Sequence, residues 1–234
     1  MPLTTLVNLI VAPGEAFGSI RARPVWSWAL LVLVILVALA SIVSAPVSRH
    51  IVETTIPAQL ANDPRFAGLP PEQAQAQIQR VLGIALLTVS FGWLLAAVVA
   101  CVVVLFEAGI LFAAVARTAA TFKQVFTLVV HVQVIGAGLY GIVNATIAAL
   151  RPVESFRTTS DYATAIPSLA WLLPASSSVK LVAFLAALHP FAIWATILLA
   201  LGLIAVAGAR RWLAWTLSIA ITLFGATLAA ALAR

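Results

Sequence analysis

Long apolar runs, separated by shorter polar or basic segments, recur along the whole chain. A helix that crosses a hydrocarbon core of ~30 Å needs ~20 predominantly apolar residues. Five runs approach or exceed this length, at about residues 25–45, 82–105, 125–150, 181–206 and 212–232. The pattern therefore predicts an all-α integral membrane protein, built as a bundle of five transmembrane helices.

The segment before the first predicted span is apolar only in short pieces. The run from Leu3 to Ala12 is too short to cross, and Pro13 with Glu15 is typical of the first turn of a helix. We predict that residues 1–24 form interfacial amphipathic helices and that residues 25–234 form one transmembrane domain. No basic residue precedes the first run, so we do not expect a cleaved signal peptide.

The composition agrees with this class of protein. Hydrophobic residues make up 63% of the chain and charged residues 9%, with a mean hydropathy of +1.13, whereas soluble domains carry about 25% charged residues. The net charge of +6 comes from scattered basic residues beside apolar runs, which favours anionic lipid headgroups over nucleic acid as partners. Cys101 is the single cysteine, so an intrachain disulfide is excluded.

The basic residues near the predicted spans indicate an orientation. A cytoplasmic N-terminus divides them equally between inner segments (Arg21, Arg23, Arg117, Lys123, Arg210, Arg211) and two outer loops (Arg49, Arg65, Arg80, Arg151, Arg157, Lys180). The inner residues are concentrated in about half as much chain. We therefore predict a cytoplasmic N-terminus and an external C-terminus.

Glu107 is the one charge in the apolar run from Val81 to Ala116. The second predicted span ends near Leu105, so we expect Glu107 at a protruding or bent helix end, paired with Arg117 or Lys123. A carboxylate deeper in the membrane is costly and is a candidate proton or substrate site. Both interpretations stay open, and the depth of Glu107 discriminates between them.

The third predicted span carries polar and small residues on two faces. One face holds Thr127, His131, Gly138, Gly141 and Ala145, and the opposite face holds Gln133, Tyr140 and Asn144. Lipid offers these groups no partner, so we expect helices on all sides of this span and a central place in the bundle. The small-residue stripe suits packing within the chain or dimerisation, and His131 suits a hydrogen bond or, less often, a metal.

Motifs that carry catalytic chemistry are missing from the sequence. It contains no GxSxG elbow, no phosphate-binding loop and no HExxH helix, and its three histidines are in separate segments. His189 beside Pro190 is expected to be an exposed interfacial histidine. Pro190 lies near the start of the fourth predicted span, and we expect that helix to continue through it without a break, since proline is tolerated in first turns and near bends. We predict no enzyme activity, no catalytic residues, no metal site and no cofactor.

Four local patterns resemble the Yip-one (Ypt-interacting protein) domain family. They comprise Pro13, Phe17, Ile20 and Pro24 before the first span; the run Thr121, Phe122, Lys123, Gln124; Phe191 and Trp194 in the fourth span; and the following Ala200, Leu201, Gly202 and Leu203. The resemblance implies a five-span membrane protein of bacterial type, located in the bacterial cytoplasmic (inner) membrane and concerned with membrane organisation or transport. The chain lacks the aspartate-leucine-tyrosine-glycine-proline motif of eukaryotic members, so small-GTPase binding is not carried over.

These observations favour a non-enzymatic protein of membrane organisation or trafficking, acting through lipid or protein contacts, including a membrane-protein partner or a homo-oligomer. The first alternative is a small transporter or lipid-translocating protein. Its polar path would use Glu107, Lys123 and His131, with Gln133 and Asn144 as further candidate residues. The second alternative is an accessory subunit that binds a larger complex through the third span.

Overall fold

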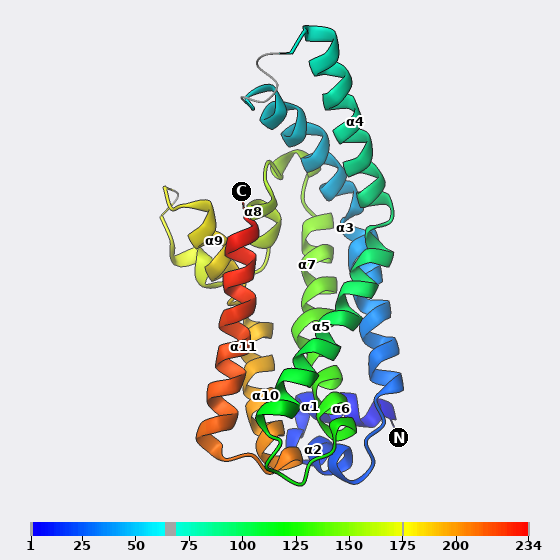
Figure 1. Cartoon of the computed structure of the whole chain (residues 1–234), viewed down its shortest axis with the longest axis vertical. Helices are drawn as coiled ribbons and strands as arrows, with labels where there is room; N and C mark the ends of the chain where they lie inside the picture. The colour runs from blue at the N-terminus through cyan, green and yellow to red at the C-terminus, as the bar shows by residue number, and fades with distance from the viewer. Residues whose placement is uncertain (1, 64–68, 175, 234) are drawn as a thin grey trace.

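The computed structural model describes residues 2–63, 69–174 and 176–233, and every regular element in these ranges is helical (Figure 1). Five stretches are long and apolar enough to cross a membrane: α3 (Ser27–Ala61), α5 (Gly92–Ala114), the stretch of α6, η1 and α7 (Phe122–Ala149), α10 (Pro190–Ala207) and α11 (Arg211–Leu232). Within the described part of the chain, the predicted five-span all-α fold is confirmed.

Two short helices, α1 (Pro2–Val11) and α2 (Pro13–Ala22), lie at the end of the bundle where α3 begins (Figure 1). Proline is tolerated at the first helical position, because its missing N–H has no intrahelical partner there, and Pro13 starts α2 in this way. Leu9, Phe17 and Ile20 are buried in the main core. The N-terminal segment is therefore packed against the spans.

The third span lies at the centre of the bundle, as predicted. It consists of α6 (Phe122–Gln133), the π-helical segment η1 (Val134–Leu139) and α7 (Tyr140–Ala149). It is the most extensively buried of the five spans and packs against α3, α5 and α10. Its small residues face α3, since a Cβ on Gly138 would lie 3.0 Å from Leu36 and one on Gly141 would lie 3.3 Å from Ala40. The stripe therefore serves packing within the chain.

The first span is longer than predicted. We expected it to end near Ala45, but α3 reaches Ala61, is 35 residues long in total and contains Pro46. At ~1.5 Å per residue this helix is about 52 Å long and exceeds the ~30 Å hydrocarbon core. Val47 and Ile51, just after the proline, are buried with Phe156. Packing therefore maintains the helix where proline removes one backbone hydrogen bond.

The second span also differs from its predicted limits of about 82–105. The chain forms α4 (Pro71–Ser90), bends at Phe91 and crosses as α5. A Cβ on Gly92 would lie 3.1 Å from the Ser41 hydroxyl, so this glycine permits close approach of α3. Figure 1 shows α4 and the second half of α3 side by side, projecting beyond the bundle. The residues 64–68 that join them, with Arg65, lie outside the described residues.

The fourth span is shorter than the predicted 181–206. The preceding connection forms η2 (Val153–Ser155), α8 (Thr159–Ala163), η3 (Leu169–Leu172) and α9 (Val179–Ala186), and α10 begins separately at Pro190. His189 is extended, with φ −94° and ψ 165°, as expected for a residue before proline. The prediction of one continuous helix was wrong because Pro190 starts a new helix.

Gly202 provides a test of this packing. A Cβ on Gly202 would overlap the buried side chain of Leu128. We expect Gly202→Leu to lower the free energy of unfolding by about 1–3 kcal/mol, as overpacked cores do. The measurement is tryptophan fluorescence during unfolding in detergent.

Gly109→Leu is the matched control, because a Cβ there meets nothing within 4 Å. We also expect that adding Leu128→Ala to Gly202→Leu restores part of the stability, because the smaller side chain relieves the overlap. Equal stability of the two single variants would contradict the proposed close contact between α6 and α10.

Candidate functional site

Glu107 is buried inside the bundle. It lies on α5, seven residues before the end of that helix, and its exposed fraction is 6%. Gln133 Nε2 donates a hydrogen bond of 2.6 Å to Glu107 Oε2. Gln133 is the last residue of α6 and immediately precedes the π-helical segment, an element that often occurs at functional sites.

This geometry corrects the prediction that Glu107 stands at a protruding helix end with Arg117 or Lys123 as its partner. Because α5 begins at Gly92 and continues to Ala114, the carboxyl is carried into the bundle and away from the helix end. Its hydrogen-bond donor is the amide of Gln133, and Lys123 is exposed at the start of α6. Gln133 was a candidate residue, but its pairing with Glu107 was not foreseen.

His131 is buried and is bonded within its own helix. Its Nδ1 lies 2.7 Å from the carbonyl oxygen of Thr127. Because a carbonyl only accepts, Nδ1 carries the proton in this contact. No group of three His, Cys, Asp or Glu side chains that could hold a metal ion occurs in the described parts of the chain. The position of His131 is that of a structural contact.

Asn144 joins the third span to the following connection. Its Nδ2 donates to the carbonyl oxygen of Tyr162 at 3.2 Å. Its buried Oδ1 has no hydrogen-bond partner among the described residues. Glu107, Lys123, His131 and Asn144 therefore have separate environments, and of the candidate polar residues the structure joins Glu107 with Gln133 alone.

His189 is buried, not exposed as predicted. Its ring stacks on Tyr140 with centroids 3.7 Å apart and planes 5° apart. Its Nδ1 accepts a hydrogen bond from the backbone N–H of Ala192, which caps the start of α10. Burial lowers the pKa of His189 to about 4, so the imidazole is neutral at pH 7 and can accept this bond.

The residues that carry the family resemblance hold the fold together. Thr121 and Gln124 form a capping box at the start of α6, and Gln124 Nε2 also donates to the Arg21 carbonyl oxygen at 2.9 Å. Phe122 packs edge-on against Phe112, with ring centroids 5.6 Å apart. The remaining members lie at helix starts, in the α2–α3 connection or against the core: Pro13, Phe17, Pro24, Phe191, Trp194 and Gly202.

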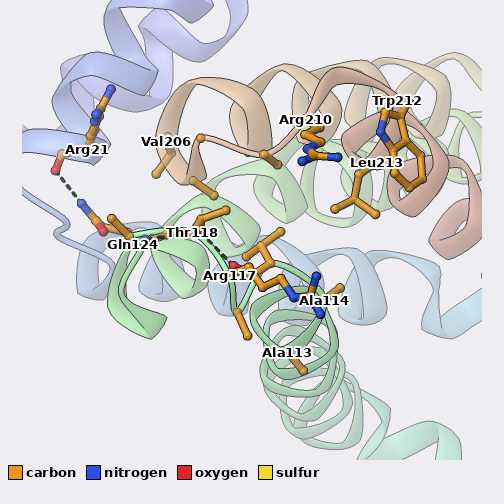
Figure 2. Close-up of a pocket in the computed structure, with 17 residues that line it drawn as sticks. Arg21, Ala113, Ala114, Arg117, Thr118, Gln124, Val206, Arg210, Trp212 and Leu213 are labelled. Carbon is orange, nitrogen blue, oxygen red and sulfur yellow. Dashed lines mark hydrogen bonds between the residues drawn. The ribbon is translucent and has the colours of Figure 1, made fainter.

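A cavity of about 730 Å³ lies at the end of the bundle where α2, α5, α10 and α11 meet (Figure 2). We call it the arginine cavity, because Arg21, Arg117 and Arg210 line it. Alanines 113, 114, 116, 119, 120, 207 and 209, with Val115, Val206 and Leu213, form most of the remaining wall. No carboxylate is among the residues that line it.

Hydrogen-bonded turns position two of these arginines. Arg117 follows α5 in a turn where the Thr118 backbone N–H donates to the Val115 carbonyl oxygen at 2.9 Å. Gly208, with φ 66°, ends α10 in the left-handed conformation that glycine adopts without strain. This conformation allows a tight turn, and Arg210 follows it directly before α11. Our sequence predictions used these arginines only for orientation, and missed that the turns bring them together.

A second cavity, of about 840 Å³, lies beside the projecting part of α3. Its wall includes His50, Glu154 and Arg157. Thr55 Oγ1 donates to the Arg157 carbonyl oxygen at 3.3 Å. This wall contains both a carboxylate and a guanidinium, so it does not select for either sign of charge as the arginine cavity does.

The five apolar spans, with buried polar contacts between them, define an integral membrane protein. The family model described as the Yip1 domain matches residues 7–232. The chain therefore belongs to the Yip1 domain family, as the four local patterns indicated. Searches of the curated proteins and of the solved structures give no match.

The Glu107 contact yields a prediction about stability. Gln133→Leu leaves a buried carboxyl without its donor, and we expect it to lower the free energy of unfolding by about 1–3 kcal/mol. Glu107→Gln retains an acceptor for Gln133 and should be close to neutral. The measurement is denaturant unfolding in detergent, followed by tryptophan fluorescence.

The double variant Glu107→Leu with Gln133→Leu is the control, because it removes both polar groups. Its loss of stability should be smaller than the sum of the losses in Glu107→Leu and Gln133→Leu. Strict additivity of the two losses would contradict a direct contact between these side chains.

Proposed function

We propose that this protein is a non-enzymatic organiser of membranes or of membrane traffic, acting through contacts with anionic lipids and membrane-protein partners at one end of the bundle. The observation that carries the proposal is the charge at the end formed by α1, α2 and the turns after α5 and α10 (Figure 1). Six basic residues lie there: Arg21, Arg23, Arg117, Lys123, Arg210 and Arg211. We call this the basic end.

Acidic residues leave this charge largely uncompensated. Glu15 is the acid of the N-terminal helices, and its Oε2 accepts a hydrogen bond from Asn8 at 3.1 Å. Five of the seven acids lie toward the opposite end, in the projecting parts of α3 and α4 and in the connections there, and Glu107 lies within a span. Anionic headgroups attract juxtamembrane basic residues by ~1 kcal/mol each. This supports a basic end that faces the cytoplasmic leaflet, with a cytoplasmic N-terminus.

The exposed face of α1 suits the same position. Val7, Ile10 and Val11 are half or more exposed on the outside of the basic end. Apolar side chains beside basic ones are typical of a helix that lies in the headgroup region. We propose that α1 and α2 lie in the plane of the interface and present Arg21 and Arg23 to the headgroups.

Reconstitution in nanodiscs tests this proposal. In discs with 30% phosphatidylglycerol, we expect an unfolding temperature several degrees above that in phosphatidylcholine alone, because a ligand that binds only the folded state stabilises it. Neutralising the basic end by Arg21→Gln, Arg23→Gln, Arg117→Gln and Arg210→Gln should abolish the difference. The readout is tryptophan fluorescence during heating.

The matched control neutralises four cations elsewhere, by Arg80→Gln, Arg151→Gln, Arg157→Gln and Lys180→Gln. This variant should retain the dependence on phosphatidylglycerol. A wild-type protein with the same unfolding temperature in both kinds of disc would refute the proposed role of anionic lipid.

The buried contact between Glu107 and Gln133 favours a second candidate, a small transporter. An ionisable residue within a span is by default a functional candidate, and this one adjoins a π-helical segment. Neither cavity described above is lined by Glu107, and Lys123 lies on the surface. The predicted path through Glu107, Lys123 and His131 is therefore not formed in this conformation.

Proton flux into liposomes distinguishes the two candidates. If the protein is a transporter that uses Glu107, a pH-sensitive dye trapped in the liposomes should report flux that Glu107→Gln reduces about tenfold or more, a loss typical of a missing acid–base group. The proposed organiser predicts the same background leak for wild type, Glu107→Gln and protein-free liposomes.

A further inference from the structure

The arginine cavity combines positive charge with an uncapped helix start. α11 begins at Arg211 without a side-chain cap, and its first-turn residues Trp212 and Leu213 line the cavity. The N–H groups of a first helical turn lack intrahelical acceptors and favour anions. These groups therefore add to the field of the guanidinium groups.

Figure 2 shows how the arginines are arranged. Arg117 and Arg210 extend from different walls, at the side of the cavity where Trp212 and Leu213 lie. Arg21 stands at the other side, where its carbonyl oxygen accepts from Gln124. Among the described residues, the ion pair within salt-bridge distance is the one between Arg49 and Glu53 of α3, far from this end. Arg117 and Arg210 are therefore exposed without a carboxylate to neutralise them.

Thr118 and Gln124 also line the cavity, but most of the remaining wall is apolar and part of it reaches the exposed surface of the bundle. Ala113 and Ala114 come from the end of α5, and Trp212 and Leu213 come from the start of α11. α5 packs on α3 and α6, while α11 packs on α9 and α10, so these two helices have different main neighbours. Ala113, Ala114 and Trp212 are exposed in the protein. Their apolar surface is therefore available for contact with lipid.

We propose that the arginine cavity binds the phosphate headgroup of one anionic phospholipid, which enters sideways from the leaflet between α5 and α11. The inference rests on the proposed function. It replaces a general attraction between the basic end and anionic headgroups with one defined binding site. The planar guanidinium groups of Arg117 and Arg210 donate charge-assisted hydrogen bonds to the phosphate oxygens. The glycerol and acyl carbons lie against Ala113, Ala114 and Trp212.

The size and wall of the cavity favour a lipid over a small soluble anion. A volume of about 730 Å³ falls within the ~300–1,000 Å³ range of pockets for drug-sized ligands, which exceeds what a single phosphate needs. The apolar side of the wall has no use in binding a free anion. Trp212 at the rim suits the headgroup region, where tryptophan is enriched.

Native mass spectrometry of the full chain in a neutral detergent tests the site, with phosphatidylglycerol as the probe. We expect one tightly retained lipid per protein. Arg117→Gln with Arg210→Gln should weaken that binding about tenfold or more, because two charge-assisted contacts are lost. Ala113→Phe, which fills the apolar wall without changing charge, should weaken it too.

The control variant is Arg23→Gln with Arg211→Gln, which removes the same charge from the same end outside the cavity wall. It should retain the bound lipid. Equal losses in both double variants would overturn the site but leave the general attraction of the basic end intact. No retention of phosphatidylglycerol above phosphatidylcholine by wild type would refute the single site, whereas the proposed function is refuted by equal unfolding temperatures in the two kinds of nanodisc.

Competition separates a lipid from a soluble anion. Inorganic phosphate and deacylated glycerophosphoglycerol, each at the concentration at which phosphatidylglycerol saturates, should not displace the bound lipid. Displacement by either compound at that concentration would overturn the lipid assignment and indicate a site for a soluble phosphate. Folding of each variant is checked by gel filtration and by its unfolding temperature.

Discussion

The fold depends on one constraint, which is that hydrocarbon offers polar groups no partner. The apolar spans satisfy their backbone groups within their own helices, so the arrangement is decided where polar side chains interrupt them. The third span carries most of these interruptions and is consequently the most buried. Gln133 on that span meets Glu107 of α5, and Asn144 meets the backbone of Tyr162. These contacts and the close approach of α3 to Gly138 fix the position of its neighbours.

The apolar runs were enough to predict the class, the number of spans and the central place of the third span, because these follow from length and from the faces of one helix. The helix ends were not predictable in the same way. Pro46 lies within α3, while Pro190 begins α10. The difference is tertiary: Val47 is buried with Phe156 just after the first proline, whereas His189 caps the helix that the second proline starts.

The candidate sites likewise combine features that the sequence predicts with features that only tertiary packing determines. The sequence singled out Glu107 and Gln133 separately, but their pairing depends on how α5 packs in the bundle, where Gly92 permits the close approach of Ser41 of α3. Local sequence does not contain that information. Arg117 and Arg210 belong to turns 90 or more residues apart along the chain, and only the packing of the helices around them brings both to one cavity.

Membership of the Yip1 domain family and the arginine cavity concern largely different residues, with Gln124 common to both. The motifs that carry the likeness cap helices, as Thr121 does, or fill the core, as Phe17 and Gly202 do. Similarity in such residues indicates a shared fold, and a fold alone does not specify a function. The cavity is built from turn residues and helix ends that the architecture positions but does not restrict in type. Under our proposal, Arg117 and Arg210 serve lipid binding and not the fold, and this end of the bundle is where a particular task is set.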